Sequence, residues 1–169
     1  SAFDVVFNEP IPDKGRVLTA MTVWWSEHLA SVASTHLVSA DPADFPTAAQ
    51  RPDWDGRALL VRKANMLPLE CIVRGYITGS AWKEYQQSGT MHGSLLPAGL
   101  LEAQQLPEPV FTPSTKATEG HDINISYQEA VDIVGSDLAS QARDLSIEAY
   151  RSASEHAAKN GVIIADTKF

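Results

Sequence analysis

The chain has 169 residues, enough for one sizeable hydrophobic core or for two small lobes. Its hydrophobic content of 44% and charged content of 20% are those of an ordinary globular protein, and no apolar run approaches the ~20 residues that a membrane-spanning helix needs. A formal net charge of -8 argues against a general nucleic-acid or anionic-membrane surface, so an anionic ligand has to be held by a local group of Lys and Arg side chains.

The first part of the chain predicts a strand, a loop and a helix. Apolar residues alternate over residues 3–7 as in a strand, and prolines then mark a loop up to Gly15. From Arg16 the pattern is helical, with one apolar face formed by Leu18, Met21, Trp25 and Leu29. The single cysteine, Cys71, excludes an intramolecular disulfide and indicates a reducing compartment, with the cytoplasm as the default.

Two further strands are predicted over residues 35–39 and 57–63, with a proline-containing loop over 41–56 between them. The break at residues 65–68 then predicts a domain boundary. We therefore expect an N-terminal sheet lobe over residues 1–66 and a C-terminal α+β lobe over residues 67–169. A hinge at such a boundary can offer unpaired backbone groups to a planar base.

The stretch from Pro68 to Tyr85 contains several residues that are suited to binding a ligand. An apolar run over residues 69–73 contains one carboxylate, Glu70, and predicts a buried strand. Arg74 follows beside Gly75, where the chain can bend freely, and residues 78–80 lead into a predicted helix. Free amides at a helix start, a hydroxyl and a guanidinium suit a phosphate monoester. A capped helix with Arg74 in a surface ion pair fits the same residues.

The second half predicts an extended loop over residues 89–113, with short strands within it as an alternative, and then a loop rich in hydroxyls that contains Lys116 and Asp122. Ser126 and Glu129 have the spacing of a capping box and predict a helix start. Gly135 is expected to separate this helix from a second one, which ends at residues 160–161.

The last residues predict a buried strand over 162–165 with Asp166 at its C-terminal end. A carboxylate in that place can aim a metal ligand into a cleft, and it can equally form a turn or cap a helix. The sequence has no Walker-type loop, no dinucleotide fingerprint and no Gly-x-Ser-x-Gly elbow, and its five histidines lack metal-ligand spacing. A nucleophilic hydrolase and a zinc enzyme are therefore poor fits.

Four stretches, in order and spacing, resemble the phosphoribosylaminoimidazole-succinocarboxamide synthase (SAICAR synthetase) family. They read SAFD at residues 1–4, LECIVRGYITGS at 69–80, FTPSTKA with HDINIS at 111–126, and ADTKF at 165–169. The resemblance covers essentially the whole chain. It implies an α+β, two-lobed SAICAR-synthetase-like fold, with an N-terminal antiparallel sheet lobe that is distantly kinase-like and an ATP site between the lobes.

The resemblance also implies an activity. Members of this family join the carboxylate of carboxyaminoimidazole ribotide (CAIR) to the amine of L-aspartate, and ATP becomes ADP and phosphate. An acyl phosphate is the expected intermediate, because a carboxylate resists attack by an amine until it carries a good leaving group. The implied cofactors are ATP and Mg²⁺. The implied partners are small molecules, without nucleic acid or membrane, in a monomer or a small homo-oligomer.

Carried over position by position, the resemblance implies roles for individual residues. The implied catalytic residues are Lys116, Asp122 and Lys168. The implied substrate-binding residues are Arg74 and Ser80 at the ribotide phosphate, together with Ser1, Asp4 and Ser114. The implied ATP-binding residues are Met66, at the adenine-facing hinge, and Glu70. The implied Mg²⁺ ligand is Asp166.

The sequence departs from the family pattern at both ends. Family members carry a phosphate loop with Gly and Lys before the SAFD stretch, and they continue past ADTKF into further acidic and Arg-bearing segments. We therefore expect the central portion of a longer enzyme. A catalytically inactive nucleotide- or phosphate-binding fragment is the alternative, and a small-molecule kinase that stops at the phosphorylated product is a third hypothesis.

Overall fold

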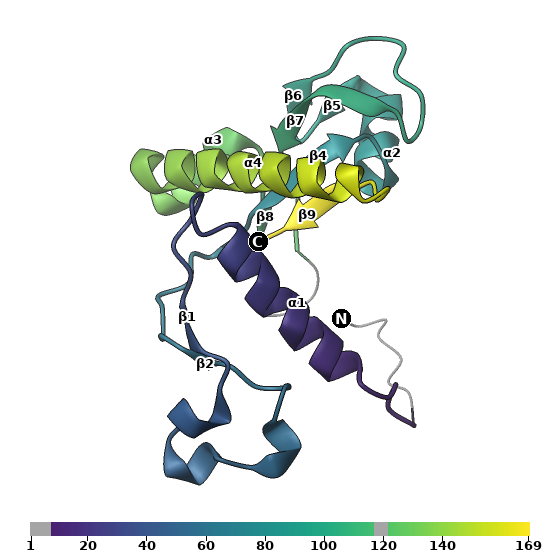
Figure 1. The fold of residues 1–169 in the computed structure, drawn as a ribbon. Helices are drawn as coiled ribbons and strands as arrows, with labels where there is room; N and C mark the ends of the chain where they lie inside the picture. The colour runs from purple at the N-terminus through teal and green to yellow at the C-terminus, as the bar shows by residue number, and fades with distance from the viewer. Residues whose placement is uncertain (1–7, 117–121) are drawn as a thin grey trace. The chain divides into compact units, whose positions relative to one another are not determined.

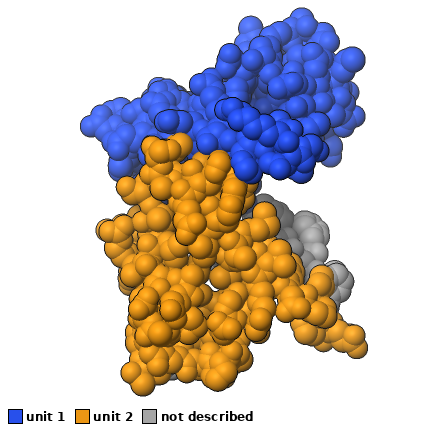
Figure 2. All heavy atoms as spheres, in the orientation of Figure 1, with its two compact units in different colours: residues 1, 67–169 blue, residues 2–66 orange. Residues whose placement is uncertain are grey.

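The computed structural model describes residues 8–116 and 122–169 (Figure 1). The chain divides into two compact units (Figure 2): residues 2–66, called the first unit here in chain order (orange, labelled unit 2), and residues 67–169 with residue 1, called the second unit here (blue, labelled unit 1). Among the described residues, no helix combines the length and the apolar character needed to cross a membrane. The strand predicted over residues 3–7 lies outside the described part of the chain.

The first unit contains one long helix and one pair of short strands. Helix α1 (Lys14–His28) confirms the helical pattern of the sequence, and β1 (Leu37–Ser39) pairs antiparallel with β2 (Leu60–Val61). The loop predicted between these strands contains three single-turn 3₁₀ helices, η1 (Pro42–Asp44), η2 (Thr47–Ala49) and η3 (Pro52–Trp54). Two of them begin at a proline, which suits a first helical turn because its missing N–H would have no partner there.

The apolar face predicted for α1 is not buried. No residue of α1 is buried, and the side chains of Leu18 and Met21 are about half exposed. Trp24 stacks on His28 of the same helix, with 4.7 Å between the ring centroids.

The second unit is built on a three-stranded antiparallel sheet with β4 (Ile72–Tyr76) in the centre. Strand β7 (Gln105–Phe111) lies on one side of β4, and β9 (Asp166–Lys168) lies on the other. The strand predicted over residues 69–73 is interrupted at Cys71. The part before the interruption is a separate strand, β3 (Leu69–Glu70), which pairs with β8 (Ser114–Thr115).

Three helices and a hairpin complete this unit. Helix α2 (Gly79–Ser88) follows β4 and precedes the hairpin of β5 (Thr90–Met91) and β6 (Ser94–Leu95). Helix α3 (Tyr127–Val134) begins with the predicted capping box, and Gly135 separates it from α4 (Ser136–Lys159). Helix α4 lies across the sheet (Figure 1), and the core there comprises Cys71, Val73, Phe111 and Tyr150.

Gly75 serves a purpose that the sequence did not indicate. It lies inside β4 and is not among the glycines with a positive φ, and the pairing of β4 with β7 shifts register between Arg74 and Tyr76. A Cβ at Gly75 would lie 1.9 Å from the hydroxyl oxygen of Tyr150, whose O–H donates to the carbonyl of Ile164 at 2.7 Å. The glycine is therefore required because α4 approaches the strand closely.

Two predictions about the strands near the site need correction. Residues 89–113 were expected to be an extended loop with short strands at most, yet residues 105–111 form β7, the longest strand in the described residues, although it contains Pro107 and Pro109. An edge strand tolerates proline because one side of its backbone needs no ladder partner. Residues 162–165 are not a buried strand: Ile163 is 72% exposed, and Asp166 begins β9 instead of ending a strand. The backbone there follows the turn after α4 before it reaches the sheet.

Candidate functional site

The site is organised around the carboxylate of Glu70 in β3. Glu70 pairs with Ser114 of β8, so the end of β8 brings Lys116 alongside it. The Nζ atom of Lys116 lies 3.0 Å from Oε1 of Glu70. The side chain of Glu70 is only 14% exposed, and the carboxylate is therefore held largely out of water beside a cation.

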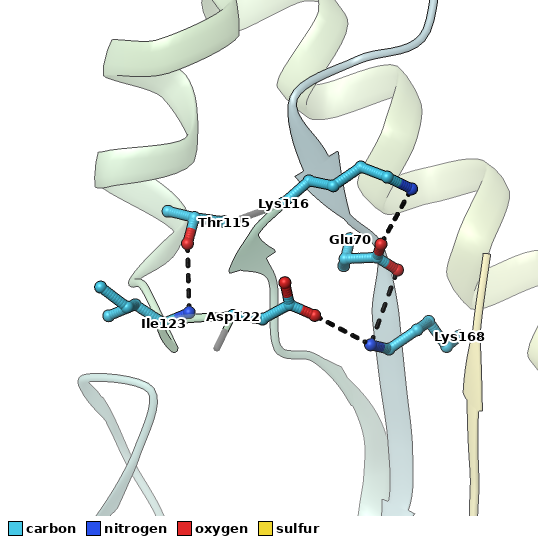
Figure 3. A network of polar contacts seen from close by, with 6 residues as sticks. All are labelled: Glu70, Thr115, Lys116, Asp122, Ile123 and Lys168. Atoms are coloured by element: carbon cyan, nitrogen blue, oxygen red, sulfur yellow. Dashed lines mark hydrogen bonds and ion pairs between the residues drawn. The ribbon is translucent and has the colours of Figure 1, made fainter. Parts of the chain in front are cut away.

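The second carboxylate oxygen of Glu70, Oε2, faces the side chain of Lys168 in β9 (Figure 3). The Nζ atom of Lys168 lies 3.6 Å from Oε2 of Glu70 and donates a hydrogen bond to Oδ2 of Asp122 at 3.3 Å. Lys168 reaches this place because β9 pairs with β4, in register with Ile72. We call Glu70, Lys116, Lys168 and Asp122 the Glu70 network.

Asp122 is positioned by the return of the chain onto β8. Backbone N–H of Thr115 donates to the carbonyl of Ile123 at 2.9 Å, and backbone N–H of Ile123 donates to the Thr115 hydroxyl at 3.1 Å (Figure 3). An isolated bridge between Ser114 and Asn124 continues this pairing. Two segments that flank residues 117–121 are therefore fixed together, one carrying Lys116 and the other Asp122.

The charges of the Glu70 network alternate in sign: lysine, glutamate, lysine, aspartate. Both lysines are about half exposed, whereas Glu70 is nearly buried. The arrangement is neutral as a whole, yet its two lysines are more exposed than its two carboxylates. The two lysine ammonium groups can bind an anion together, because the Glu70 carboxylate between them offsets their mutual repulsion.

A second ion pair lies on the neighbouring strands. Arg74 of β4 is in register with Asp166 of β9, and Nη1 of Arg74 donates to Oδ2 of Asp166 at 3.3 Å. The arginine side chain is 11% exposed and the aspartate side chain 48%. The Nε atom of Arg74 is buried and has no hydrogen-bond partner among the described residues.

Ser80 lies in the first turn of α2 and is exposed. The first hydrogen bond of this helix runs from the N–H of Trp82 to the carbonyl of Thr78, and the Thr78 side chain does not cap the helix. The amides of the first turn therefore remain available, at the positive end of the helix dipole.

The sequence model of the SAICAR synthetase family matches residues 1–169. This chain belongs to the SAICAR synthetase family. The phosphoribosylaminoimidazole-succinocarboxamide synthase of Pelobacter propionicus is 54% identical over 173 residues, which cover 100% of this chain and 58% of that relative. Among solved structures, the SAICAR synthase from Saccharomyces cerevisiae complexed with SAICAR is 44% identical with a TM-score of 0.88, over 100% of this chain and 58% of that one.

A more distant structure, a type-2 SAICAR synthetase in complex with ADP, is 25% identical with a TM-score of 0.75, over 99% of this chain and 62% of that one. The chain therefore spans less than two thirds of the length of each of these relatives of the SAICAR synthetase family. The α+β fold expected from the resemblance is confirmed by these neighbours.

The remaining residues implied by the SAICAR synthetase resemblance lie in different settings. Met66 is 75% exposed, at the end of the first unit. Ser114 is buried, and its hydroxyl oxygen has no hydrogen-bond partner among the described residues. Ser1 and Asp4 lie outside the described part of the chain.

In the described part of the chain, no three His, Cys, Asp or Glu residues gather into a metal-binding group. Asp166 remains compatible with Mg²⁺, which proteins commonly hold through one or two carboxylates while substrate phosphates supply further oxygens. Its carboxylate is half exposed, and only Oδ2 is engaged by Arg74. The residues present therefore fit a single-carboxylate Mg²⁺ site.

Sequence reasoning missed His92, which follows β5. Its side chain is buried, and its ring Nδ1 lies 3.1 Å from the carbonyl oxygen of Pro113. Burial, with a smaller contribution from the charge of Arg74, holds the pKa of His92 below its ordinary value despite that hydrogen bond. A search for metal-ligand spacing passes over such a residue, and nothing else in the local sequence marks it.

Proposed function

We propose that the protein carrying this chain is an ATP-dependent ligase of purine biosynthesis that joins CAIR to L-aspartate and forms SAICAR, ADP and phosphate. Membership of the SAICAR synthetase family over residues 1–169 supports this activity. One structural observation carries it further: Glu70, Lys116, Asp122 and Lys168 come from segments far apart in the sequence and form one network.

The chemical difficulty is to bring anions together. The CAIR carboxylate has to attack the γ-phosphorus of ATP, which forms an acyl phosphate and releases ADP. The aspartate amine then attacks the acyl carbon, loses a proton, and phosphate leaves. We assign Lys116 and Lys168 to the neutralisation of charge that develops on the transferred phosphoryl group, since preoriented cations act most strongly where water is excluded.

We assign Glu70 to the orientation of these two lysines. The resemblance gives Glu70 to the ATP site, and its contacts refine this role, because each carboxylate oxygen faces one ammonium group. A flexible lysine held at a fixed point loses less side-chain entropy when an anion arrives. Asp122 holds Lys168 from the other side and lies near the reacting groups in this proposal.

Arg74 and Ser80 are proposed to bind the ribotide phosphate. The guanidinium supplies a planar set of donors that suits a phosphate, and the first turn of α2 supplies backbone amides and a hydroxyl. Ser1, Asp4 and Ser114 remain proposed substrate contacts on the strength of the family pattern. Met66 remains the proposed adenine contact on the strength of the family pattern.

Mg²⁺ is proposed to bind at Asp166. When bound, the ion supplies positive charge at the ATP phosphates. Arg74 is the present partner of Asp166, and both residues can change partner because an incoming phosphate suits the guanidinium and an incoming cation suits the carboxylate. We place the protein in the cytoplasm, a proposal supported by the single, buried cysteine.

ADP release by the purified protein tests this function. With Mg²⁺ and ATP present, ADP should form only when both CAIR and L-aspartate are added, and SAICAR should appear in equal amount. ADP release with CAIR alone would favour a small-molecule kinase. Binding of ATP or CAIR without turnover would favour the noncatalytic binding fragment instead.

A further inference from the structure

The segment that joins α4 to β9 leads directly to Asp166, and side-chain packing holds much of it only weakly. Val162 and Ile163 are exposed, and a pocket of about 260 Å³ is lined by these residues, by α4 and by the sheet. Ile164, next along the chain, packs against the core that contains Val73 and Tyr150. The way in which residues 164 and 165 are anchored therefore decides where Asp166 enters the sheet.

Two hydrogen bonds anchor these two residues. The Tyr150 hydroxyl of α4 donates to the carbonyl oxygen of Ile164 at 2.7 Å. Backbone N–H of Gly75 in β4 donates to the carbonyl oxygen of Ala165 at 3.0 Å. From Asp166 onward, β9 pairs with β4 in register. The Tyr150 hydroxyl thus holds the chain immediately before the sheet pairing begins.

The Tyr150 hydroxyl is itself held at a fixed point. The ring is buried in the core beside Val73 and Phe111, where close packing leaves it little freedom. A Cβ at Gly75 would lie 1.9 Å from the hydroxyl oxygen, so the missing side chain of the glycine makes room for this oxygen against the strand. Because the donor cannot move far, the carbonyl of Ile164 has to come to it.

Tyr150 and Asp166 lie on opposite faces of the sheet. Successive residues of a strand point to opposite faces. Tyr150 meets β4 at Gly75, whereas Asp166 pairs with the side chain of Arg74, the preceding residue. Tyr150 therefore acts on Asp166 through the backbone of residues 164–166, and its side chain is directed away from the proposed metal.

We propose that Tyr150 is a positioning residue for Asp166, because its hydroxyl fixes the backbone from which the Asp166 carboxylate extends. This inference rests on the proposed function, which assigns Mg²⁺ to Asp166. The carboxylate is about half exposed and can change its partner, whereas the backbone that carries it stays in place. An anchored carboxylate loses less conformational entropy when it binds a cation.

Tyr150→Phe, made in the protein that carries this chain, tests the inference. The substitution keeps the ring in the core and removes the hydroxyl, so the carbonyl of Ile164 loses its donor. Tyr85→Phe is the matched control. The Tyr85 hydroxyl also donates to a backbone carbonyl, that of Pro97 at 2.6 Å, and the Tyr85 ring packs against a different core cluster.

The first measurement is amide hydrogen exchange by NMR, which needs no substrate or metal. In Tyr150→Phe, the Gly75 N–H should exchange about tenfold faster than in the unmodified protein, because its acceptor at Ala165 adjoins the released carbonyl. The Ile77 N–H, which donates to the carbonyl of Gln104 at 3.0 Å, is the internal reference and should change less. Equal acceleration of both amides would indicate a general loss of stability and overturn the inference. Tyr85→Phe should not accelerate Gly75 selectively.

The second measurement is the Mg²⁺ dependence of ADP formation. In Tyr150→Phe, the Mg²⁺ concentration for half-maximal rate should rise about tenfold, while the CAIR concentration for half-maximal rate stays unchanged. Tyr85→Phe should leave both values unchanged. In an Asp166→Asn background, Tyr150→Phe should have no further effect on the Mg²⁺ dependence.

An unchanged Mg²⁺ requirement in Tyr150→Phe, despite faster exchange at Gly75, would refute the positioning role. If the unmodified protein forms no ADP while the exchange results hold, the proposed function fails and the anchoring of residues 164–166 by Tyr150 stands.

Discussion

Two carboxylates of the site, Glu70 and Asp166, have opposite settings. The Glu70 side chain is 14% exposed and each of its oxygens faces a lysine, whereas the Asp166 side chain is 48% exposed and only Oδ2 meets Arg74. A nearly buried carboxylate between two cations is costly to rearrange, while an exposed one with a single partner is not. Under the proposed function, we expect from this comparison that Glu70 holds other groups in place and that Asp166 exchanges partners.

The largest expected effect comes from Asp166→Asn, which keeps the size of the side chain and removes its charge. We expect kcat for ADP formation to fall by about 10²–10³, the range seen when a preoriented electrostatic contact is lost. The Mg²⁺ concentration needed for half-maximal rate should rise. CAIR affinity should be kept or increased, because Arg74 loses a competing partner. Initial rates across Mg²⁺ and CAIR concentrations check all three results.

Asp144→Asn is the matched control for this change. Asp144 is also paired with an arginine, Arg143, at 2.7 Å, and it lies on the exposed surface of α4. We expect its kinetics to match those of the unmodified protein. Asp166→Asn with an unchanged Mg²⁺ dependence would show that this carboxylate does not bind the metal.

Glu70→Gln tests the other side of the comparison. The two lysines are about half exposed and can turn into water, so we expect little loss of stability. They would no longer be held at fixed points, and kcat should fall by about 10–100-fold. Glu108→Gln provides the control, since Glu108 forms an exposed ion pair with Arg151 at 2.8 Å. A rate unaffected by Glu70→Gln would contradict the orienting role.

Gly75→Ala should disturb Arg74 and Asp166 indirectly, by disturbing the packing of β4 against α4. Backbone N–H of Gly75 donates to the carbonyl of Ala165, and the added methyl group would meet the Tyr150 hydroxyl. Overpacking of this kind costs about 1–3 kcal/mol of unfolding free energy. Chemical denaturation of Gly75→Ala, Tyr150→Ala and the double variant measures it. Strict additivity of the two single effects would show that the contact is not the cause.

The sequence predicted what depends on local chemistry. The capping box of Ser126 and Glu129 is present at the start of α3, and α4 ends at Lys159, before the expected stop at Asn160. These features are encoded within a few residues, so they need no tertiary information. The α+β fold of the SAICAR synthetase family came from motifs spread along the chain, not from any single element.

What failed depends on tertiary structure. The prolines of residues 105–111 favoured a loop with short strands at most, and the position of β7 at the sheet edge is what allows a longer strand there. The apolar residues 162–165 predicted a buried strand, yet the pairing of β9 with β4 begins only at Asp166. The contacts of the Glu70 network were not predicted, because strand pairing brings together Glu70 and Lys168, which are far apart in the sequence. The family resemblance implied these residues as site residues but not their contacts with one another. His92 left no local signal at all.

The smallest expected effect is a pH dependence that originates at His92. Its pKa is lowered in the folded protein, so the unfolded chain binds more protons as the pH falls below about 6.5. The unfolding free energy should therefore be fully retained above about pH 6.5 and decrease below it. The charged groups that face His92 are Arg74 of β4, which disfavours protonation, and Glu84 of α2, which favours it.

The titration of Glu84 has to be distinguished from that of His92. Although burial would raise its pKa, hydrogen bonds from the turn at His92 hold the pKa of Glu84 below its ordinary value, so the stability it contributes is lost at lower pH, below about 4.5. Urea denaturation between pH 5 and pH 8 isolates the histidine. The decline in unfolding free energy toward pH 5 should be smaller in His92→Asn than in the unmodified protein. Identical slopes would mean that His92 does not titrate differently in the folded and unfolded states.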